Sequence, residues 1–280
     1  MAKPRRWLEW EAAQARDWIA VPQSTDDKYS RGVLGMRTGS TEYPGAAVLG
    51  VEAASRTGVG MVRFLGARRV STLVLQRRPE VVTADGRVQA WLLGSGLDAG
   101  ARSADTTRQL QKALRQGVPT VLDAGALDLV GDGTGARVIT PHYRELAGLL
   151  NRSGETVEVA QIAQSPGEWA VRAAGRLGVT VLLKGSTTHV ASPSGIRLTV
   201  SGAPAWLATA GSGDVLAGIL GALLATHSAT LEADADALAA LAATACFVHS
   251  AAASRASGGG PIVALDIAQA VPATIAALLA

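Results

Sequence analysis

The chain has 280 residues, of which 48 % are hydrophobic and only 18 % are charged, and it contains 32 glycines. This composition excludes a disordered chain and indicates a large buried core, in one large α/β domain or two small ones. The formal net charge is +3. The Lys and Arg residues form no basic stripe interleaved with aromatic residues, which argues against nucleic-acid binding.

The single cysteine, Cys246, cannot form an intrachain disulfide and is expected in the core. Its presence as a lone thiol indicates a reducing, cytoplasmic setting. The residues that follow the basic start carry too many charges for a secretory signal. No apolar run is expected to reach the roughly 18 residues that a membrane helix needs. We therefore predict no membrane contact.

The chain begins with a predicted amphipathic helix over residues 7–19, which Pro22 ends. This helix belongs to an N-terminal lead over residues 1–24. One domain is expected over residues 25–280, because no internal repeat or long linker divides it. Its first helix is predicted to start at about Pro44, since proline suits the first position of a helix. Three tryptophans are expected to share one apolar face of the lead helix: Trp7, Trp10 and Trp18.

Further along the chain, short β-branched or apolar runs alternate with turn residues and helical stretches. This alternation predicts an α/β fold whose central, mostly parallel sheet has helices on both faces. The predicted strands are 72–75, 89–93, 120–122, 137–139 and 179–183. A hairpin is expected over 187–191 and 196–200. Two helices, around 235–255 and from about Leu265, close the chain.

Glycines or polar residues directly follow four of the predicted strands. These residues are Gly94-Ser95-Gly96, Asp123, Thr140-Pro141-His142 and Lys184-Gly185. Ligands bind beyond the carboxyl ends of the strands in open α/β sheets, so this edge is the predicted site. The alternative explanation is that strand ends are simply rich in turn residues. That would explain the glycines but not the presence of Asp123, His142 and Lys184 together. Asp123 itself is expected only to cap the turn that follows it.

The most informative segment is Gly211-Ser212-Gly213-Asp214, which lies directly before an apolar stretch with helical spacing. Three small residues leave the first amides of the helix bare, and such amides bind anions such as phosphate. The carboxylate of Asp214 has two interpretations. Asp214 is either an N-cap or an acid in the first turn of the helix, or it is a base that takes a proton from a hydroxyl about to attack a phosphoryl group.

Taken in order, these segments resemble the ADP/ATP-dependent NAD(P)H-hydrate dehydratase family, a branch of the ribokinase-like superfamily. The similarity runs from about residue 26 to residue 272, and its opening part looks like an actinobacterial version of the family. The segments that carry it are Gly39-Ser40, Tyr43-Pro44-Gly45-Ala46-Ala47, Gly94-Ser95-Gly96, Val121-Leu122-Asp123-Ala124, Thr140-Pro141-His142 with Glu145, Leu183-Lys184-Gly185 with Thr188, Gly211-Ser212-Gly213-Asp214 and residues 264–272.

The resemblance implies a ribokinase-like fold and a metabolite-repair enzyme. In this family, the S form of NADH or NADPH hydrated at C6 of the nicotinamide ring is phosphorylated on its new hydroxyl by ADP or ATP. Loss of the phosphate then restores NADH or NADPH. The bacterial character of the motifs favours ADP. Mg²⁺ is expected with the nucleotide, and the resemblance implies a homo-oligomer, with a tetramer as the usual size.

The resemblance also implies roles for the matched positions. Asp214 would be the catalytic base, and an anion hole for the transferring phosphoryl group would come from the amides of Gly211, Ser212 and Gly213. The nucleotide would contact Lys184, Gly185, Ser186, Thr187, Thr188 and Gly213. The hydrated dinucleotide would contact Ala46, Gly96, His142 and Asp214. No metal ligands are assigned.

The chain departs from the family pattern at three places. Ala210 stands where the family usually has glycine, Gly125 stands where it has a second acid, and residues 202–206 replace an Asn-Pro-Gly-like stretch.

Two other functions therefore stay open. A ribokinase-like kinase of a small alcohol would use the same anion hole and base. A nucleotide-binding module without catalysis would keep only the nucleotide site.

Overall fold

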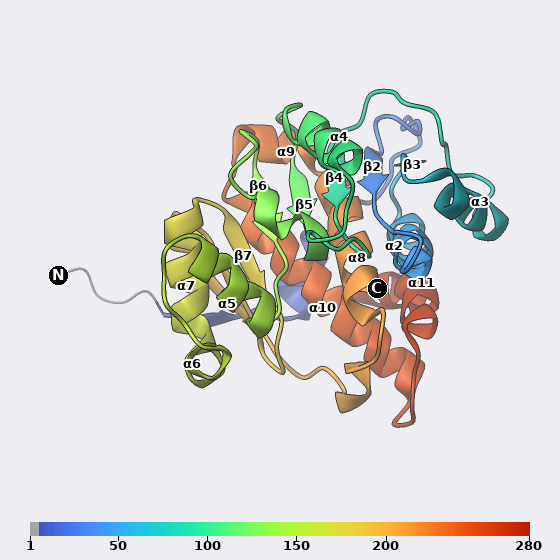
Figure 1. The fold of residues 1–280 in the computed structure, drawn as a ribbon. Helices are drawn as coiled ribbons and strands as arrows, with labels where there is room; N and C mark the ends of the chain where they lie inside the picture. Colours follow the sequence, from blue (N-terminus) through green and yellow to red (C-terminus); the bar gives the residue numbers. More distant parts are fainter. Residues whose placement is uncertain (1–5) are drawn as a thin grey trace.

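The computed structural model describes residues 6–280 (Figure 1). Within that range, nine strands form one sheet in the order β1-β9-β8-β7-β6-β5-β4-β2-β3. Neighbouring strands are parallel except where β8 pairs antiparallel with β7 and with β9. The strands are β1 (Leu8–Glu9), β2 (Val33–Arg37), β3 (Met61–Phe64), β4 (Ala90–Leu93), β5 (Thr120–Leu122), β6 (Arg137–Ile139), β7 (Thr180–Leu183), β8 (Thr188–Ala191) and β9 (Arg197–Val200).

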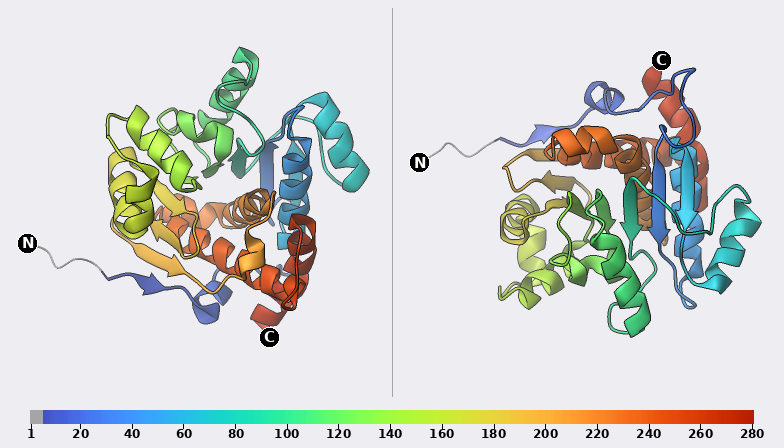
Figure 2. Two further views of the ribbon diagram at one scale, coloured as in Figure 1. Left: turned by 60° about the horizontal axis from the view of Figure 1, so that its bottom comes forward. Right: turned by 90° about the horizontal axis from the view of Figure 1, so that it is seen from above.

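Helices cover both faces of this sheet, as the two turned views show (Figure 2). The α-helices are α1 (Ala12–Arg16), α2 (Pro44–Thr57), α3 (Arg68–Arg77), α4 (Ala104–Leu114), α5 (Tyr143–Arg152), α6 (Val159–Gln164), α7 (Pro166–Leu177), α8 (Ser212–Thr226), α9 (Ser228–Ala233), α10 (Ala237–Ser257) and α11 (Ala264–Leu279). Two short 3₁₀ helices are η1 (Ala124–Leu129) and η2 (Ala205–Leu207).

Two apolar cores lie on the two faces of the sheet, because successive side chains of a strand point to opposite sides. In β4, Leu92 packs in the core that holds α2, α8, α10 and α11. Its neighbours Trp91 and Leu93 pack in the other core, with α4, α5 and α7. All three side chains are at most 1 % exposed. The predicted α/β architecture, with a mostly parallel sheet between helical layers, is confirmed.

The predicted N-terminal lead helix is wrong. In the described part of the lead, Leu8–Glu9 forms β1 beside β9, and only Ala12–Arg16 is α-helical. Residues 1–5 of the lead lie outside the described residues. The tryptophans do not share a helix face: Trp10 Nε1 donates to Thr244 Oγ1 (3.1 Å), and Trp7 packs edge-on against His189. Each ring packs on its own part of the fold.

The predicted strand over residues 72–75 is also wrong, because these residues lie inside α3. Val70 and Val74 are four residues apart and both are buried, which is helical spacing. The strands β2 and β3 were not predicted. The other predicted strands, the hairpin and the helix that begins at Pro44 are confirmed, and Pro44 lies in the first turn of α2.

We expected no apolar run long enough to span a membrane, and helix α10 departs from this expectation. Among the described residues, it is the one helix long and apolar enough to cross a membrane, with 21 residues and a mean hydropathy of 1.5 in its most apolar window. However, 78 % of that window is buried inside the fold. Burial on this scale identifies α10 as a core helix, which packs against α8 and α11.

A buried carboxylate joins α2 to α3. The Glu52 side chain of α2 is fully buried and accepts hydrogen bonds from Arg56 Nε (2.5 Å), Arg77 Nε (3.2 Å) and Arg78 Nε (2.6 Å). Burial by itself would raise the pKa of Glu52, but the hydrogen bonds from Arg78 and Arg56 outweigh it and lower the pKa to about 2. Glu52 therefore keeps its negative charge under all ordinary conditions.

Candidate active site

The site is built around the first turn of α8. Gly211, its N-cap, has a φ of +85°, a conformation that favours glycine, and a Cβ there would lie 2.5 Å from Leu49 Cδ1. Asp214 lies in the first turn, and no side chain caps this helix. Of the amides predicted to form the anion hole, that of Ser212 is not free, because it donates to the Thr209 carbonyl (3.3 Å). Within residues 6–280, the amides of Gly213 and Asp214 have no hydrogen-bond acceptor. The helix entrance therefore presents free donors, and Asp214 does not act as its cap.

The carboxyl group of Asp214 is in an unusual electrostatic environment. Burial raises its pKa, the negative charge of Asp123 raises it further, and the positive charge of Lys184 lowers it. The result is a pKa of about 7. A group with this pKa can accept and release a proton near neutrality, which is what a general base requires.

Asp123 lies beside Asp214 at the end of β5, where it is 3 % exposed. Its carboxylate accepts hydrogen bonds from Ser95 Oγ (2.8 Å), Thr140 Oγ1 (2.7 Å) and Lys184 Nζ (3.2 Å). The expectation that Asp123 only caps the next turn is wrong, because its side chain makes no capping bond to η1. It instead joins residues that follow the parallel strands β4, β6 and β7.

Lys184 supplies the positive charge of the site. Its ammonium group lies 3.2 Å from Asp123 Oδ1 and 3.8 Å from Glu145 Oε2. Burial favours the neutral amine, but the charges of Asp123 and Glu145 outweigh burial and raise the pKa of Lys184. A Cβ added to Gly213 would lie 3.6 Å from Lys184 Nζ. The ammonium therefore stays charged next to the free amides of α8.

A cavity of about 520 Å³ opens next to Lys184 and the α8 entrance. One end is polar, with Lys184, Ser212 and Gly213. The remaining lining combines the polar Ser186, Thr188, His249 and Ser250 with apolar side chains from Val200, Ala203, Pro204, Ala205, Leu207, Leu216 and Cys246. Of the predicted nucleotide contacts, Lys184, Gly185, Ser186, Thr188 and Gly213 line this cavity, whereas Thr187 does not. A polar end beside an apolar slot suits a molecule with a phosphate chain and a flat base.

The residues predicted to contact the dinucleotide lie in two different parts of the site. Gly96 lies against the start of α2, where an added Cβ would be 2.5 Å from Ala46 Cβ. His142 pairs with Lys184 in a β-bridge, which brings it to the polar end of the cavity. The ring of His142 is also the N-cap of α5, where Nδ1 accepts the Glu145 amide (3.1 Å). It therefore has a structural role next to the site.

His249 and Cys246 of α10 line the same cavity. His249 is buried, with 4 % exposure, next to the Ser212 backbone, and among residues 6–280 its buried Nε2 has no hydrogen-bond partner. Burial lowers its pKa to about 4, so the ring is neutral. Cys246 is buried as expected, and burial raises the pKa of its thiol to about 11, which makes it a poor nucleophile.

The described residues have a ribokinase-like α/β fold. The structure resembles that of a ribokinase-like superfamily protein from Enterococcus faecalis, with a TM-score of 0.81 at 21 % identity over 97 % of this chain and 96 % of the other. It also resembles an ADP/ATP-dependent NAD(P)H-hydrate dehydratase from Bacillus subtilis, with a TM-score of 0.84 at 22 % identity over 97 % and 99 %. Both similarities concern the fold.

The chain belongs to the NAD(P)H-hydrate dehydratase family, whose sequence profile matches residues 34–271. It is 40 % identical over 271 residues to the bifunctional NAD(P)H-hydrate repair enzyme Nnr of Mycobacterium leprae, covering 91 % of this chain and 52 % of that protein. The ADP-dependent (S)-NAD(P)H-hydrate dehydratase of Neisseria meningitidis is 36 % identical over 221 residues, covering 72 % of each. The chain spans about half the length of the bifunctional relatives that it matches.

Proposed function

We propose that this chain dehydrates the S form of NADH and NADPH hydrate at the expense of ADP, as the name of the neisserial relative states for that protein. The observation that carries the proposal is the partly buried carboxyl of Asp214, with a pKa of about 7, in the same helical turn as unpaired amides. A base and an anion site in one turn are the two elements that phosphorylation of an alcohol needs.

In the proposed reaction, Asp214 accepts the proton of the C6 hydroxyl while the oxygen attacks the terminal phosphorus of the nucleotide. The new O–P bond forms as the P–O bond to the leaving nucleotide breaks. The free amides of Gly213 and Asp214 and the ammonium of Lys184 stabilise the charge on the phosphoryl oxygens. The C6–O bond then breaks, the neighbouring ring carbon loses a proton, and phosphate departs as the ring double bond returns.

The nucleotide occupies the cavity beside Lys184, with its phosphates at the polar end and its base against the apolar wall. Thr187 does not line that cavity, so its proposed role is limited to shaping the loop between β7 and β8. The hydrated ring reaches Asp214 from the side of Ala46 and Gly96, which contact one another. His142, next to Lys184, completes the site on the nucleotide side.

The residues fit a magnesium ion that arrives with the nucleotide. Among residues 6–280, no three His, Cys, Asp or Glu side chains cluster as a protein-only metal site. Mg²⁺ instead takes substrate phosphates and waters together with one or two carboxylates. Asp123 and Glu145, which flank Lys184, are the acidic groups that would hold it. When bound, the ion would neutralise phosphate charge. The Bacillus subtilis relative was co-crystallised with ATP/Mg²⁺.

Two further parts of the proposal concern the cellular setting. Cys246 is free and buried, which supports a reducing, cytoplasmic location. We also propose a homo-oligomer, with a tetramer as the expected size.

The proposal predicts recovery of reduced nicotinamide. Purified protein with ADP, Mg²⁺ and hydrated NADH is expected to regain the absorbance of NADH, because loss of phosphate restores the ring double bond. Continuous absorbance measurement, with ATP in place of ADP as a second arm, tests this. A stable phosphorylated product without NADH recovery would identify a kinase. Bound nucleotide with neither product would identify a binding module.

The pKa of Asp214 predicts the pH dependence of the reaction. Only the ionised carboxylate accepts a proton, so kcat/KM is expected to rise from pH 6 to pH 8 with an inflection near 7. The nucleotide phosphate also titrates near pH 6, so the Asp123→Asn variant serves as the comparison. Removing the Asp123 charge lowers the pKa of Asp214 and should move the inflection to lower pH. An unmoved inflection in Asp123→Asn would assign the titration to another group.

A further inference from the structure

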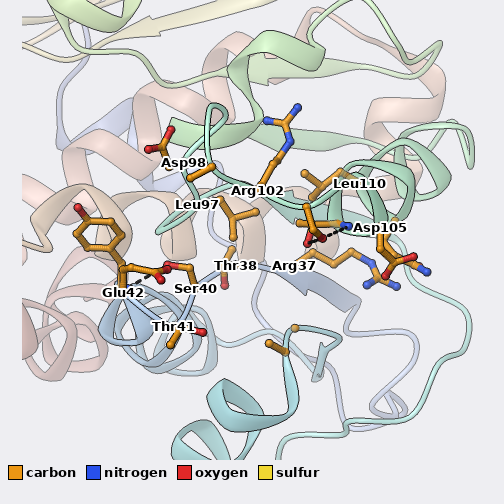
Figure 3. A pocket seen from close by; sticks show the side chains of 18 of the residues that line it. Arg37, Thr38, Ser40, Thr41, Glu42, Leu97, Asp98, Arg102, Asp105 and Leu110 are labelled. Atoms are coloured by element: carbon orange, nitrogen blue, oxygen red, sulfur yellow. Dashed lines mark hydrogen bonds between the residues drawn. The ribbon is translucent and has the colours of Figure 1, made fainter.

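A second cavity, of about 510 Å³, lies over the carboxyl ends of β2, β3 and β4 (Figure 3). In the strand order, β5 and β6 separate these strands from β7, which Lys184 follows. Arg37 at the end of β2, Leu65 after β3 and Leu97 after β4 line it, and Leu110 of α4 contributes to one wall. Its volume falls within the range of small-molecule sites. The cavity is therefore large enough to hold a nucleoside phosphate.

Helix α2 connects this cavity to Asp214. Its N-cap Tyr43 lines the cavity, and Ala46, one turn further, contacts Gly96. Leu49, in the next turn, lies against Gly211 at the α8 entrance. A ligand that reaches Asp214 at one end can thus extend along the first turns of α2 into the second cavity.

Among the described residues, Arg37 forms no direct ion pair, although the negative charges of Asp85 and Asp105 act on its guanidinium, which also lies 6.0 Å from the centre of the Trp91 ring. Its Nη1 donates to the Leu65 carbonyl (2.8 Å), and its buried Nε has no partner. Within residues 6–280, no carboxylate lies within 4.0 Å of its guanidinium. Arg102, the other arginine of the cavity, is paired with Asp128 through two hydrogen bonds of 2.8 and 2.6 Å. Burial of a charge costs free energy unless an opposite charge compensates, and burial lowers the pKa of Arg37.

Three carboxylates also line the cavity, and their positions restrict where an anion can bind. Asp105 lies near Arg37, but it pairs with Arg108 (3.1 Å). Glu42 and Asp98 lie at the end away from Arg37 (Figure 3). Carboxylates accept hydrogen bonds from hydroxyl groups and repel phosphate. The α2 end of the cavity is therefore suited to hydroxyl groups, and a phosphate can bind at the Arg37 end, where the charge of Asp105 is balanced by Arg108.

We propose that this cavity holds the adenosine half of the hydrated dinucleotide and that Arg37 binds the 2′-phosphate that distinguishes the NADPH form from the NADH form. The inference rests on the proposed function for the identity of the dinucleotide. It adds a specificity-determining residue that lies outside the reacting centre. Arginine favours such a group because its planar guanidinium forms paired hydrogen bonds with phosphate oxygens.

The test compares both hydrates in the Arg37→Gln variant. The kcat/KM for NADPH hydrate is expected to fall at least about tenfold more than that for NADH hydrate, since a charge-assisted bond to phosphate is lost. Arg37→Lys should recover part of the difference. Arg115→Gln, which removes an exposed arginine at the end of α4, should leave both values unchanged. Equal losses for the two hydrates in Arg37→Gln would overturn the assignment.

A binding measurement separates this inference from the proposed reaction. Calorimetric titration with NADP⁺ and with NAD⁺, under saturating ADP to fill the nucleotide site, needs no turnover. Wild-type protein should bind NADP⁺ at least about tenfold more tightly than NAD⁺, and Arg37→Gln should lose that preference. If the protein shows this NADP⁺ preference but dehydrates neither hydrate, the role of Arg37 in the cavity is supported and the proposed reaction is rejected. Equal affinity of the wild-type protein for both ligands would reject the role of Arg37.

Discussion

Replacing Asp214 by asparagine is expected to lower kcat about 10³-fold, because the variant has no group to accept the hydroxyl proton. The affinity for ADP should stay within about twofold, since the amides and Lys184 that would contact the phosphates are retained. Single-turnover kinetics together with nucleotide titration check both parts. A variant with a near-normal rate would show that Asp214 is not the base.

The same substitution should stabilise the protein. Unfolded chains release the aspartate proton near pH 3.8, whereas folded Asp214 holds it up to about pH 7. Wild-type stability therefore falls as pH rises through this window, and Asp214→Asn avoids the loss. At pH 8 the variant should be more stable by about 2–3 kcal/mol, and the gain should shrink at pH 5. Urea unfolding at both pH values measures this, with Asp236→Asn at an exposed position as the control.

Glu52→Gln is expected to destabilise the fold by about 3 kcal/mol, because three guanidinium groups lose their shared buried partner. The folded pKa of about 2 lies below the unfolded value, so the contribution of Glu52 is present above about pH 4.5 and is lost as pH falls toward 2. Urea unfolding at pH 7 gives the loss directly. Glu52 lines neither of the two cavities of the proposed site, so the residual folded fraction should keep its activity.

Glu80 is the matched control for Glu52. It accepts a bond from the same Arg78 (3.3 Å), but its side chain is 57 % exposed. Exposed ion pairs contribute little, so Glu80→Gln should cost less than about 0.5 kcal/mol. Similar losses in the two variants would show that burial is not the cause of the effect.

The sequence pattern predicted the architecture well where local signals and packing agree. The alternation of β-branched runs and helical stretches gave the parallel strands β4 to β7 and the hairpin of β8 and β9. The strand predicted over residues 72–75 is wrong because their β-branched composition favours a strand, whereas the buried pair Val70 and Val74 requires a helix. Strand β1 could not be found locally, because it depends on pairing with β9, about 190 residues away.

The candidate site was predicted in its position but not in its internal contacts. The residues at the strand ends do meet at one edge of the sheet, as the rule for parallel strands predicts. The ion pair of Asp123 with Lys184 joins residues 61 positions apart, and it depends on a strand order that the sequence does not contain. Burial of His249 against Ser212 depends in the same way on how α10 packs on α8.

The strand order has a consequence for the traffic of ligands. One cavity lies over β2, β3 and β4 and the other lies beyond β7, with β5 and β6 between them in the sheet. Under the proposed function, the nucleotide and the dinucleotide enter from separate cavities and come together at the α8 entrance. The proposed arrangement predicts that spent nucleotide can be exchanged while the repaired dinucleotide is still bound, so that turnover follows no fixed order of binding and release.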